Sequence, residues 1–379
     1  MNQATLTPAA RADTLVSAYE RAGYARSSAA MLQPAEPFLD LSGEEIRRRM
    51  YLVTDSAGRE LCLRPDLTIP VARDYLDSSA AGQPAKFCYL GPVFRDGESA
   101  SGEFLQAGIE SFGRADKAAA DAETIALALE ATAHYGLATP EIRLGDVALF
   151  AALIAALDLA PAWQRRLIKD FNRKTTLAHD LDRLAPGIGA TVPEYQGVLA
   201  ALANSDPVAA HALITDLLSI AGISTVGGRS VSEIADRFLE QAALGARTTL
   251  PRETRALIER FLAIASAPDK AATALRALAA DANLSFGPAL DLFENRNQIL
   301  AACGIDLARI QFATAFGRGL DYYTGVVFEL YDPAHRTASQ LVAGGRYDGL
   351  LTRLGCAEPV PAVGFAVWIE RLAALGEAP

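Results

Sequence analysis

The feature of this sequence that most constrains its fold is the placement of its strand-like runs, which cluster toward the two ends of the chain. Such runs occur at 51–54, 60–63, 86–90 and 107–112, and again at 311–316, 324–330 and 364–368. Between them, residues 147–305 are rich in Ala and Leu and are interrupted by prolines, which indicates several helices. We therefore predict one α+β domain, formed by residues 1–146 and 306–379 and interrupted by a mostly helical insertion over 147–305.

The composition narrows the classes of function. Hydrophobic residues make up 51% of the chain, enough for a sizeable core, yet no apolar run reaches the roughly 20 residues of a membrane-spanning helix. The first residues carry no secretory pattern, so we expect a cytoplasmic protein that does not bind membranes. A net charge of −10 disfavours tRNA as the main ligand. The four cysteines and four histidines have neither C-x-x-C nor zinc-type spacing, so we predict no disulfide framework and no metal site.

Candidate ligand-binding residues fall in a few short segments. Gln106 and Glu110 are four residues apart, and in a strand an even spacing places both side chains on one face. The same reasoning applies to Asp66 and Thr68. Carboxylate and amide oxygens in one cavity suit an ammonium group or a ring N–H.

Three residues in a glycine-rich segment would complete such a site. Arg318 offers a fork for a carboxylate, and Tyr322 and Tyr323 offer an aromatic wall. Together with the acceptors, they would suit a small zwitterion with a polar side chain. The alternative is that these residues only form turns and surface ion pairs.

These segments resemble the signature segments of histidyl-tRNA synthetase, a class II aminoacyl-tRNA synthetase. They are Leu-Arg-Pro-Asp-Leu-Thr at 63–68, Gly-Arg-Gly-Leu-Asp-Tyr-Tyr-Thr-Gly at 317–325 and Ala-Gly-Gly-Arg-Tyr-Asp-Gly-Leu at 343–350. The resemblance spans roughly residues 10–375 and implies a class II synthetase-like core, mostly an antiparallel sheet flanked by helices. By the same resemblance, histidine would be bound by its α-amino group at Asp66, Thr68 and Gln106, by its imidazole at Glu110 and Tyr322, and by its carboxylate at Arg318, with Tyr323 beside it.

The departures from the synthetase pattern concern ATP. Arg95 and Arg371 are present, but Ala100 and Gly102 stand where the family has two further arginines. Trp368 replaces a glycine that would let a nucleotide lie close to the backbone, although the indole could instead turn into a core. We interpret Arg95, Gly102, Trp368 and Arg371 as a vestigial nucleotide site and expect no catalytic residues. Seven residues follow the last family segment, so we expect no C-terminal anticodon-binding domain.

A synthetase-like core that binds histidine without activating it is similar to the regulatory subunits of ATP phosphoribosyltransferase. That resemblance implies a non-catalytic dimer without cofactor, partnered by a short-form catalytic subunit and responsive to L-histidine in histidine biosynthesis. Two alternatives stay open. One is a minimal enzyme that forms histidyl-adenylate for an acceptor other than tRNA. The other is a scaffold that binds no histidine, because Asp66 and Leu67 depart from the family's Glu and Gly.

Overall fold

The computed structural model of the chain describes residues 7–99, 101–184, 207–220, 225–226, 229–230, 250–337 and 339–376. The chain divides into two compact units. The first comprises Met1–Ala152 and Arg260–Pro379, and the second comprises Leu153–Glu259.

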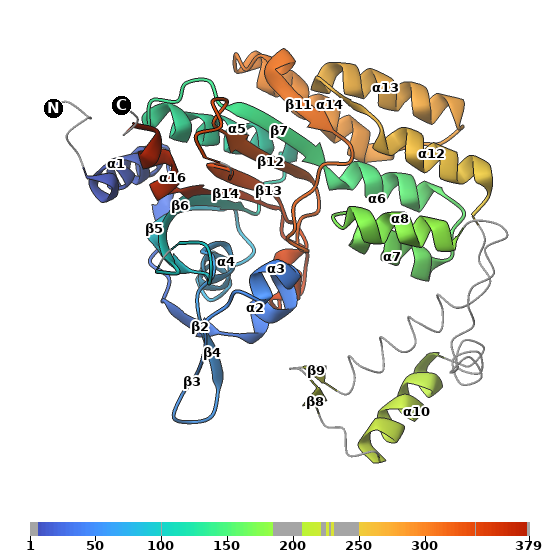
Figure 1. Ribbon diagram of the computed structural model, residues 1–379, viewed down its shortest axis with the longest axis horizontal. Coiled ribbons are helices and arrows are strands. Elements are labelled where there is room, and N and C mark those ends of the chain that lie inside the picture. The colour runs from blue at the N-terminus through green and yellow to red at the C-terminus, as the bar shows by residue number, and fades with distance from the viewer. Residues whose placement is uncertain are drawn as a thin grey trace. The chain divides into compact units, whose positions relative to one another are not determined.

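A nine-stranded sheet forms the centre of the first unit (Figure 1), in the order β1-β5-β6-β14-β13-β12-β7-β11-β10. Its strands are β1 (Ala25–Arg26), β5 (Ala85–Phe94), β6 (Glu103–Phe112), β7 (Glu141–Asp146), β10 (Ala265–Ser266), β11 (Ile310–Ala313), β12 (Val326–Tyr331), β13 (Val342–Arg346) and β14 (Ala362–Trp368). Among the described strands, β1–β5 and β11–β7 pair in parallel, and the other six neighbours are antiparallel. The predicted α+β class with a mostly antiparallel sheet is confirmed.

Helices flank this sheet. They are α1 (Pro8–Arg21), α2 (Glu36–Leu41), α3 (Gly43–Arg47), α4 (Thr68–Leu76), α5 (Lys117–His134), α13 (Pro268–Asp281), α14 (Gly287–Ala302), α15 (Leu350–Arg353) and α16 (Ile369–Ala373), with the short 3₁₀ turns η2 (Leu307–Arg309) and η3 (Ala374–Gly376). Helix α5 packs on β12, β13 and β14, and α14 packs on α5. Arg346, the last residue of β13, reaches Asp121 of α5, whereas its neighbour Tyr347 bonds to Glu110 of β6. Because successive residues of an extended chain point to opposite faces, α5 and Glu110 lie on opposite sides of the sheet.

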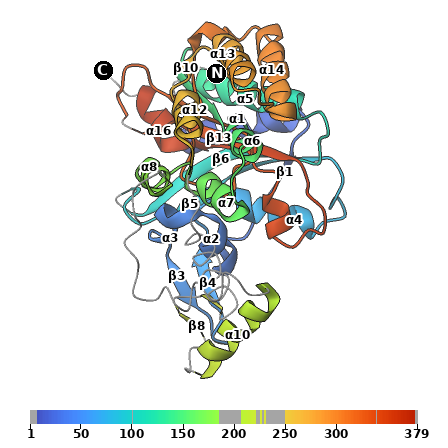
Figure 2. The same ribbon diagram turned by 90° about the vertical axis from the view of Figure 1, so that its right-hand side faces the viewer.

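Local sequence signals fix the first helix and a hairpin formed by the strand-like runs at 51–54 and 60–63. Thr7 accepts a hydrogen bond from the Ala10 N–H at 3.3 Å and so caps α1, which Pro8 opens. Strands β3 (Leu52–Thr54) and β4 (Glu60–Leu63) pair around a turn whose Asp55 carboxylate accepts the N–H groups of Ala57 and Arg59. With β2 (Leu32–Pro34) they form a three-stranded sheet that extends away from the large sheet in both views (Figures 1 and 2).

The boundaries expected for the helical insertion are too wide. We predicted an insertion over 147–305, but the second unit covers only Leu153–Glu259. Helices α13 and α14 belong to the first unit because α14 packs on α5 and inserts Arg296 between Asp121 (3.3 Å) and Asp146 (2.8 Å). All three side chains are buried, so this ion-pair network holds α14 to the sheet.

The second unit is described in part. Its elements include α7 (Pro161–Asp170), α8 (Lys174–Arg183), α10 (Pro207–Ile220) and a two-stranded hairpin of β8 (Thr225–Val226) and β9 (Arg229–Ser230). Helices α6 (Val147–Ala156) and α12 (Arg252–Leu262) run across its two boundaries with the first unit. Across the described ranges, every helix falls short of the length and apolar character needed to cross a bilayer.

A buried hydrophobic cluster of the first unit lies beside helix α4. It includes Phe38, Leu67 and Tyr75, whose ring stacks on Phe112 with centroids 4.6 Å apart. Tyr322 and Trp368 belong to the same cluster and also line a cavity. The core of this unit therefore continues directly into the wall of that cavity.

Candidate functional site

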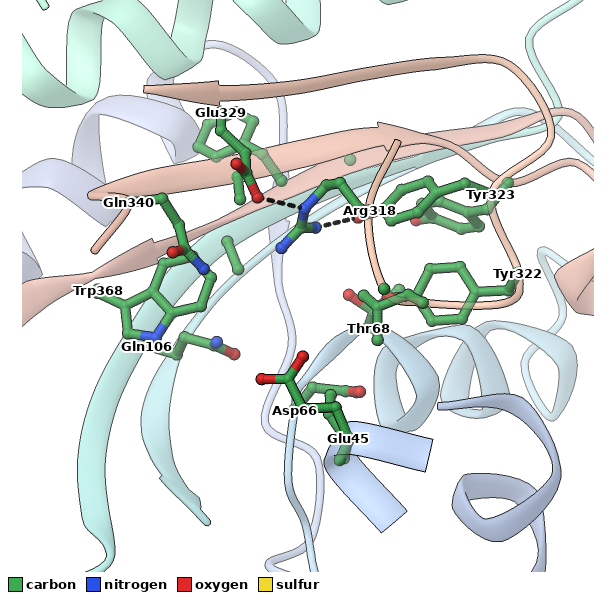
Figure 3. A pocket seen from close by; sticks show the side chains of 18 of the residues that line it. Glu45, Asp66, Thr68, Gln106, Arg318, Tyr322, Tyr323, Glu329, Gln340 and Trp368 are labelled. Carbon is green, nitrogen blue, oxygen red and sulfur yellow. Dashed lines mark hydrogen bonds and ion pairs between the residues drawn. The ribbon is translucent and has the colours of Figure 1, made fainter. Parts of the chain in front are cut away.

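A cavity of about 250 Å³ lies in the first unit between the large sheet, the start of α4 and the segment that follows β11 (Figure 3). Drug-sized ligand pockets enclose roughly 300–1,000 Å³, so this cavity suits a molecule of amino-acid size. It is lined by Glu45, Ile46, Asp66, Thr68, Arg95, Gln106, Arg318, Gly319, Leu320, Tyr322, Tyr323, Glu329, Gln340, Ala343, Tyr347, Gly364, Phe365, Ala366 and Trp368. Six of the seven predicted histidine-binding residues are in this set.

Asp66 and Thr68 reach the cavity by a different route from the one we predicted. We expected a strand, but β4 ends at Leu63 and Thr68 is the first residue of α4. Asp66 is buried, and its Oδ1 accepts the Ile69 N–H at 3.2 Å, while its Oδ2 has no partner among the described residues. Burial raises the pKa of Asp66, and the neighbouring Arg95 opposes that shift. A buried acceptor without a partner is one that a ligand ammonium would satisfy.

Gln106 and Glu110 both lie on β6, as predicted, but only Gln106 lines the cavity. The Gln106 side chain is buried, and its Oε1 has no partner among the residues described. Glu110 lies one layer behind, against Gly364, where Tyr347 donates a hydrogen bond to its Oε2 and Tyr89 donates one to its Oε1 at 3.3 Å. The structure thus places Glu110 outside the cavity lining and against two tyrosines, and not in the direct contact with a ligand that we predicted.

The same burial changes the chemistry of Glu110. Removal from water raises the pKa of this carboxyl group to about 8, even though the hydroxyls of Tyr347, Thr68 and Tyr89 favour the charged form. At neutral pH Glu110 is then mostly protonated. It acts as an uncharged anchor for Tyr347, whose side chain does line the cavity.

Arg318 is held from two sides. Its Nε donates to Glu329 Oε1 at 3.1 Å and its Nη1 donates to the Tyr323 hydroxyl at 2.6 Å. Burial would lower the pKa of Arg318, but its interactions with the Tyr323 hydroxyl and the Glu329 carboxylate outweigh it and keep the group cationic. The third nitrogen points into the open space between Gln106 and Asp66 (Figure 3). It is oriented to donate to a ligand carboxylate.

Three tyrosines form the wall beside Arg318. The ring centroids of Tyr322 and Tyr323 are 4.9 Å apart, and those of Tyr322 and Tyr347 are 5.7 Å apart in an edge-on arrangement. All three line the cavity; Tyr322 and Tyr347 are buried, and Tyr323 is partly buried. Such a wall favours a flat, partly polar group of a ligand.

Two of the four residues that we interpreted as a vestigial nucleotide site line the cavity, and two do not. Arg95 and Trp368 line the same cavity as the histidine-site candidates. The indole of Trp368 is 4% exposed, with the Arg371 guanidinium 4.9 Å from its ring centroid, so it occupies space at the cavity wall. Its Nε1 has no partner among the described residues.

Arg371 and Gly102 lie outside the cavity lining. Arg371 donates to the Gln340 carbonyl at 2.6 Å and pairs with Glu98. Gly102 has a φ of 71°, and a Cβ there would collide with the Tyr51 hydroxyl, so an arginine at this position would strain the backbone and displace the Tyr51 side chain. Ala100, the other position at which the family has an arginine, is outside the described residues.

Sequence reasoning missed four polar lining residues: Glu45, Glu329, Gln340 and Tyr347. Two of them lie in segments that the sequence had singled out, Glu329 in the strand-like run 324–330 and Tyr347 in the family segment 343–350. The alternation of β12 and β13 could have suggested which of their residues share a face. Glu45 and Gln340 reach the cavity from segments without a distinctive pattern.

The cavity therefore combines unpartnered acceptors with one oriented cation. Asp66 and Gln106 present oxygen atoms, and Arg318 presents an N–H group within the same enclosed space. This arrangement can bind a small zwitterion through both of its charged ends.

Comparison with known proteins gives the family context for this cavity. A family profile described as histidyl-tRNA synthetase matches residues 4–219 and 208–372. The ATP phosphoribosyltransferase regulatory subunits of Brucella ovis and Brucella canis are each 42% identical to the chain over 351 residues, which cover 91% of this chain and 91% of theirs.

Solved structures give the same fold. A Bacillus halodurans protein described as an ATP phosphoribosyltransferase regulatory subunit/histidyl-tRNA synthetase aligns with a TM-score of 0.67 at 22% identity, over 97% of this chain and 78% of that one. Histidyl-tRNA synthetase from Nostoc sp. PCC 7120 aligns with a TM-score of 0.61 at 18% identity, over 96% of this chain and 70% of that one. At these identities the likeness establishes the fold.

Proposed function

Because the chain belongs to the family of ATP phosphoribosyltransferase regulatory subunits, which have the fold of histidyl-tRNA synthetase, we propose that it is a non-catalytic subunit of that enzyme. It supports the activity of a short-form catalytic subunit and makes that activity sensitive to L-histidine. The step it controls is the first of histidine biosynthesis.

The observation that carries the histidine part of this proposal is the enclosed cavity with its unpartnered acceptors and its oriented arginine. In the proposed complex, Asp66, Thr68 and Gln106 receive the α-ammonium group. Arg318 donates to the carboxylate through its third nitrogen. The imidazole lies against Tyr322 and Tyr323.

Glu110 has an indirect role in this proposal. It holds the hydroxyl of Tyr347, and Tyr347 completes the aromatic wall. Glu329 has the corresponding role for Arg318 because it fixes the guanidinium through Nε. Both carboxyl groups then orient side chains that contact the ligand.

Regulation requires a second state of the complex. A ligand shifts a conformational equilibrium only by its difference in affinity between two states, and the resulting coupling between two sites is typically about 1–3 kcal/mol. We propose that a dimer of this chain, with the unit 153–259 as an insertion in a synthetase-like core, carries the catalytic subunits and changes state when histidine binds.

The direct test measures phosphoribosyl-ATP formation by a short-form catalytic subunit, with and without this protein, over a titration of L-histidine. We expect the protein to raise activity and histidine to reverse that increase. The variant Arg318→Gln should still raise activity but should respond only to much higher histidine concentrations. If activity is unchanged and the two proteins elute separately in size-exclusion chromatography, the regulatory proposal is wrong.

A pyrophosphate-exchange assay tests the enzymatic alternative. The protein alone should show no histidine-dependent exchange, because Trp368 and Gly102 replace the features with which the family binds ATP. Robust exchange would favour histidine activation instead.

A further inference from the structure

Two arginines pair with a single carboxylate beside the cavity, and a third interacts with its charge. Glu98, in the loop after β5, accepts a hydrogen bond from Arg49 Nη2 at 2.8 Å and pairs with Arg371 Nη2. Its charge also acts on Arg95, which lines the cavity. Glu98 is largely enclosed, with 11% of its side chain exposed.

The loop that carries Glu98 is fixed to the same arginine. The Asp96 N–H donates to the Arg49 carbonyl at 2.9 Å, and Arg49 Nε donates to the Asp96 carbonyl at 2.7 Å. Gly97, between Asp96 and Glu98 in the sequence, has a φ of 70°, which allows the chain to turn tightly before Glu98. The backbone thus directs this carboxylate inward, toward the arginines.

Arg371 depends on Glu98 for its neutralisation. Within the described part of the chain its other contacts are the Gln340 carbonyl and the face of Trp368, and neither carries a charge. Arg49 has a second carboxylate, Glu45, but at 3.7 Å and with 75% of that side chain exposed. Glu98 is therefore the one described carboxylate that bridges two of these guanidinium groups.

Guanidinium groups bind the oxygens of carboxylates and phosphates with the same planar fork. A carboxylate fixed between two of them stands where an external oxyanion would otherwise bind. We propose that Glu98 is an internal counter-anion that occupies an oxyanion site between Arg49 and Arg371, so that phosphate groups of ligands are excluded from this site beside the cavity. This inference is independent of histidine binding and of the catalytic partner.

The test is the binding of inorganic pyrophosphate to the full chain and to Glu98→Gln, measured by isothermal titration calorimetry without added metal. Pyrophosphate tests the anion site alone because it lacks the adenosine that Trp368 would obstruct. Glutamine keeps the size of Glu98 and can still accept a hydrogen bond from Arg49, so the loop should stay in place. We expect Glu98→Gln to bind pyrophosphate at least tenfold more tightly than the unmodified chain, and less tightly as salt is added.

Two further variants test whether the increase in pyrophosphate affinity comes from the position of Glu98. Glu45→Gln removes a carboxylate next to the same Arg49 and from the same cavity, and it should leave pyrophosphate binding unchanged. Adding Arg371→Gln to Glu98→Gln should abolish the gain. Should Glu98→Gln fail to fold by circular dichroism, Glu98→Ala carries the same expectation.

Equal affinity of the unmodified chain and Glu98→Gln would overturn the proposal. So would an equal gain in Glu45→Gln, because the effect would then come from net charge and not from the position of Glu98.

Discussion

Replacement of Arg318 by Gln should weaken the binding of L-histidine by a predictable amount. Two of the three guanidinium nitrogens are already used, Nε by Glu329 at 3.1 Å and Nη1 by the Tyr323 hydroxyl at 2.6 Å. One nitrogen remains for the ligand carboxylate. A hydrogen bond to a charged group contributes about 1.5–3 kcal/mol. Since about 1.4 kcal/mol is a factor of ten, the dissociation constant should rise roughly 10- to 150-fold.

A second variant, Arg318→Lys, tests the same contact more specifically. Calorimetry measures the dissociation constant of L-histidine for both variants. A single ammonium group cannot bond Glu329, Tyr323 and a ligand in this geometry, so lysine should resemble glutamine more than arginine. Arg276→Gln is the matched control, because Arg276 pairs with Asp291 and Glu294 on an exposed surface. Unchanged affinity in a folded Arg318→Gln protein would refute the assigned role. No binding by the unmodified chain would refute the histidine proposal itself.

Three other predictions concern the buried side chains of Glu110, Arg296 and Trp368. Burial raises the pKa of Glu110 from 4.5 to about 8, so between these values the folded chain keeps a proton that the unfolded chain releases. The free energy of unfolding, measured by urea denaturation, should therefore fall by up to ~1.4 kcal/mol per pH unit between pH 5 and 8. The fall should be less steep in Glu110→Gln. An equal slope in both proteins would contradict this. Arg296→Ala leaves Asp146 and one oxygen of Asp121 unpaired in the core and should cost about 3–5 kcal/mol in urea denaturation, so a loss below 1 kcal/mol would contradict the network. Millimolar ATP should leave the melting temperature of the unmodified chain unchanged, because Trp368 occupies the space; a clear rise would mean that the nucleotide space is open.

The sequence predicted those parts of the fold whose signals are local. Thr7 with Pro8, and Asp55 with the turn after it, bond to their own neighbours, so their patterns are sufficient to place a helix and a hairpin. The C-terminal boundary of the insertion, in contrast, depends on contacts between residues far apart in the sequence. Helix α14 resembles other Ala-rich helices of 147–305, and its assignment to the first unit depends on Arg296 reaching residues 150 and 175 positions away.

The candidate site was predictable to a similar extent. Strand parity placed Gln106 and Glu110 on one face, but parity gives the face of a strand and not the depth of each side chain. Hydrogen bonds from the hydroxyls of Tyr89, on β5, and Tyr347, the residue after β13, hold Glu110 behind the cavity. Asp66 and Thr68 converge through the first turn of α4, which their spacing did not predict.

The cavity and its surroundings combine open binding groups with two obstacles to a nucleotide. Asp66, Gln106 and Arg318 still face open space, whereas Trp368 fills one wall and Glu98 neutralises Arg371 behind it. In our proposal these two residues would exclude different parts of a nucleotide, the indole its adenosine and the carboxylate its phosphates. Removing either obstacle alone should therefore give little ATP binding, and Trp368→Gly combined with Glu98→Gln should give more than the sum of the two single effects. Melting temperatures of the four proteins with millimolar ATP test this non-additivity, and purely additive shifts would mean that the two residues do not block the same ligand.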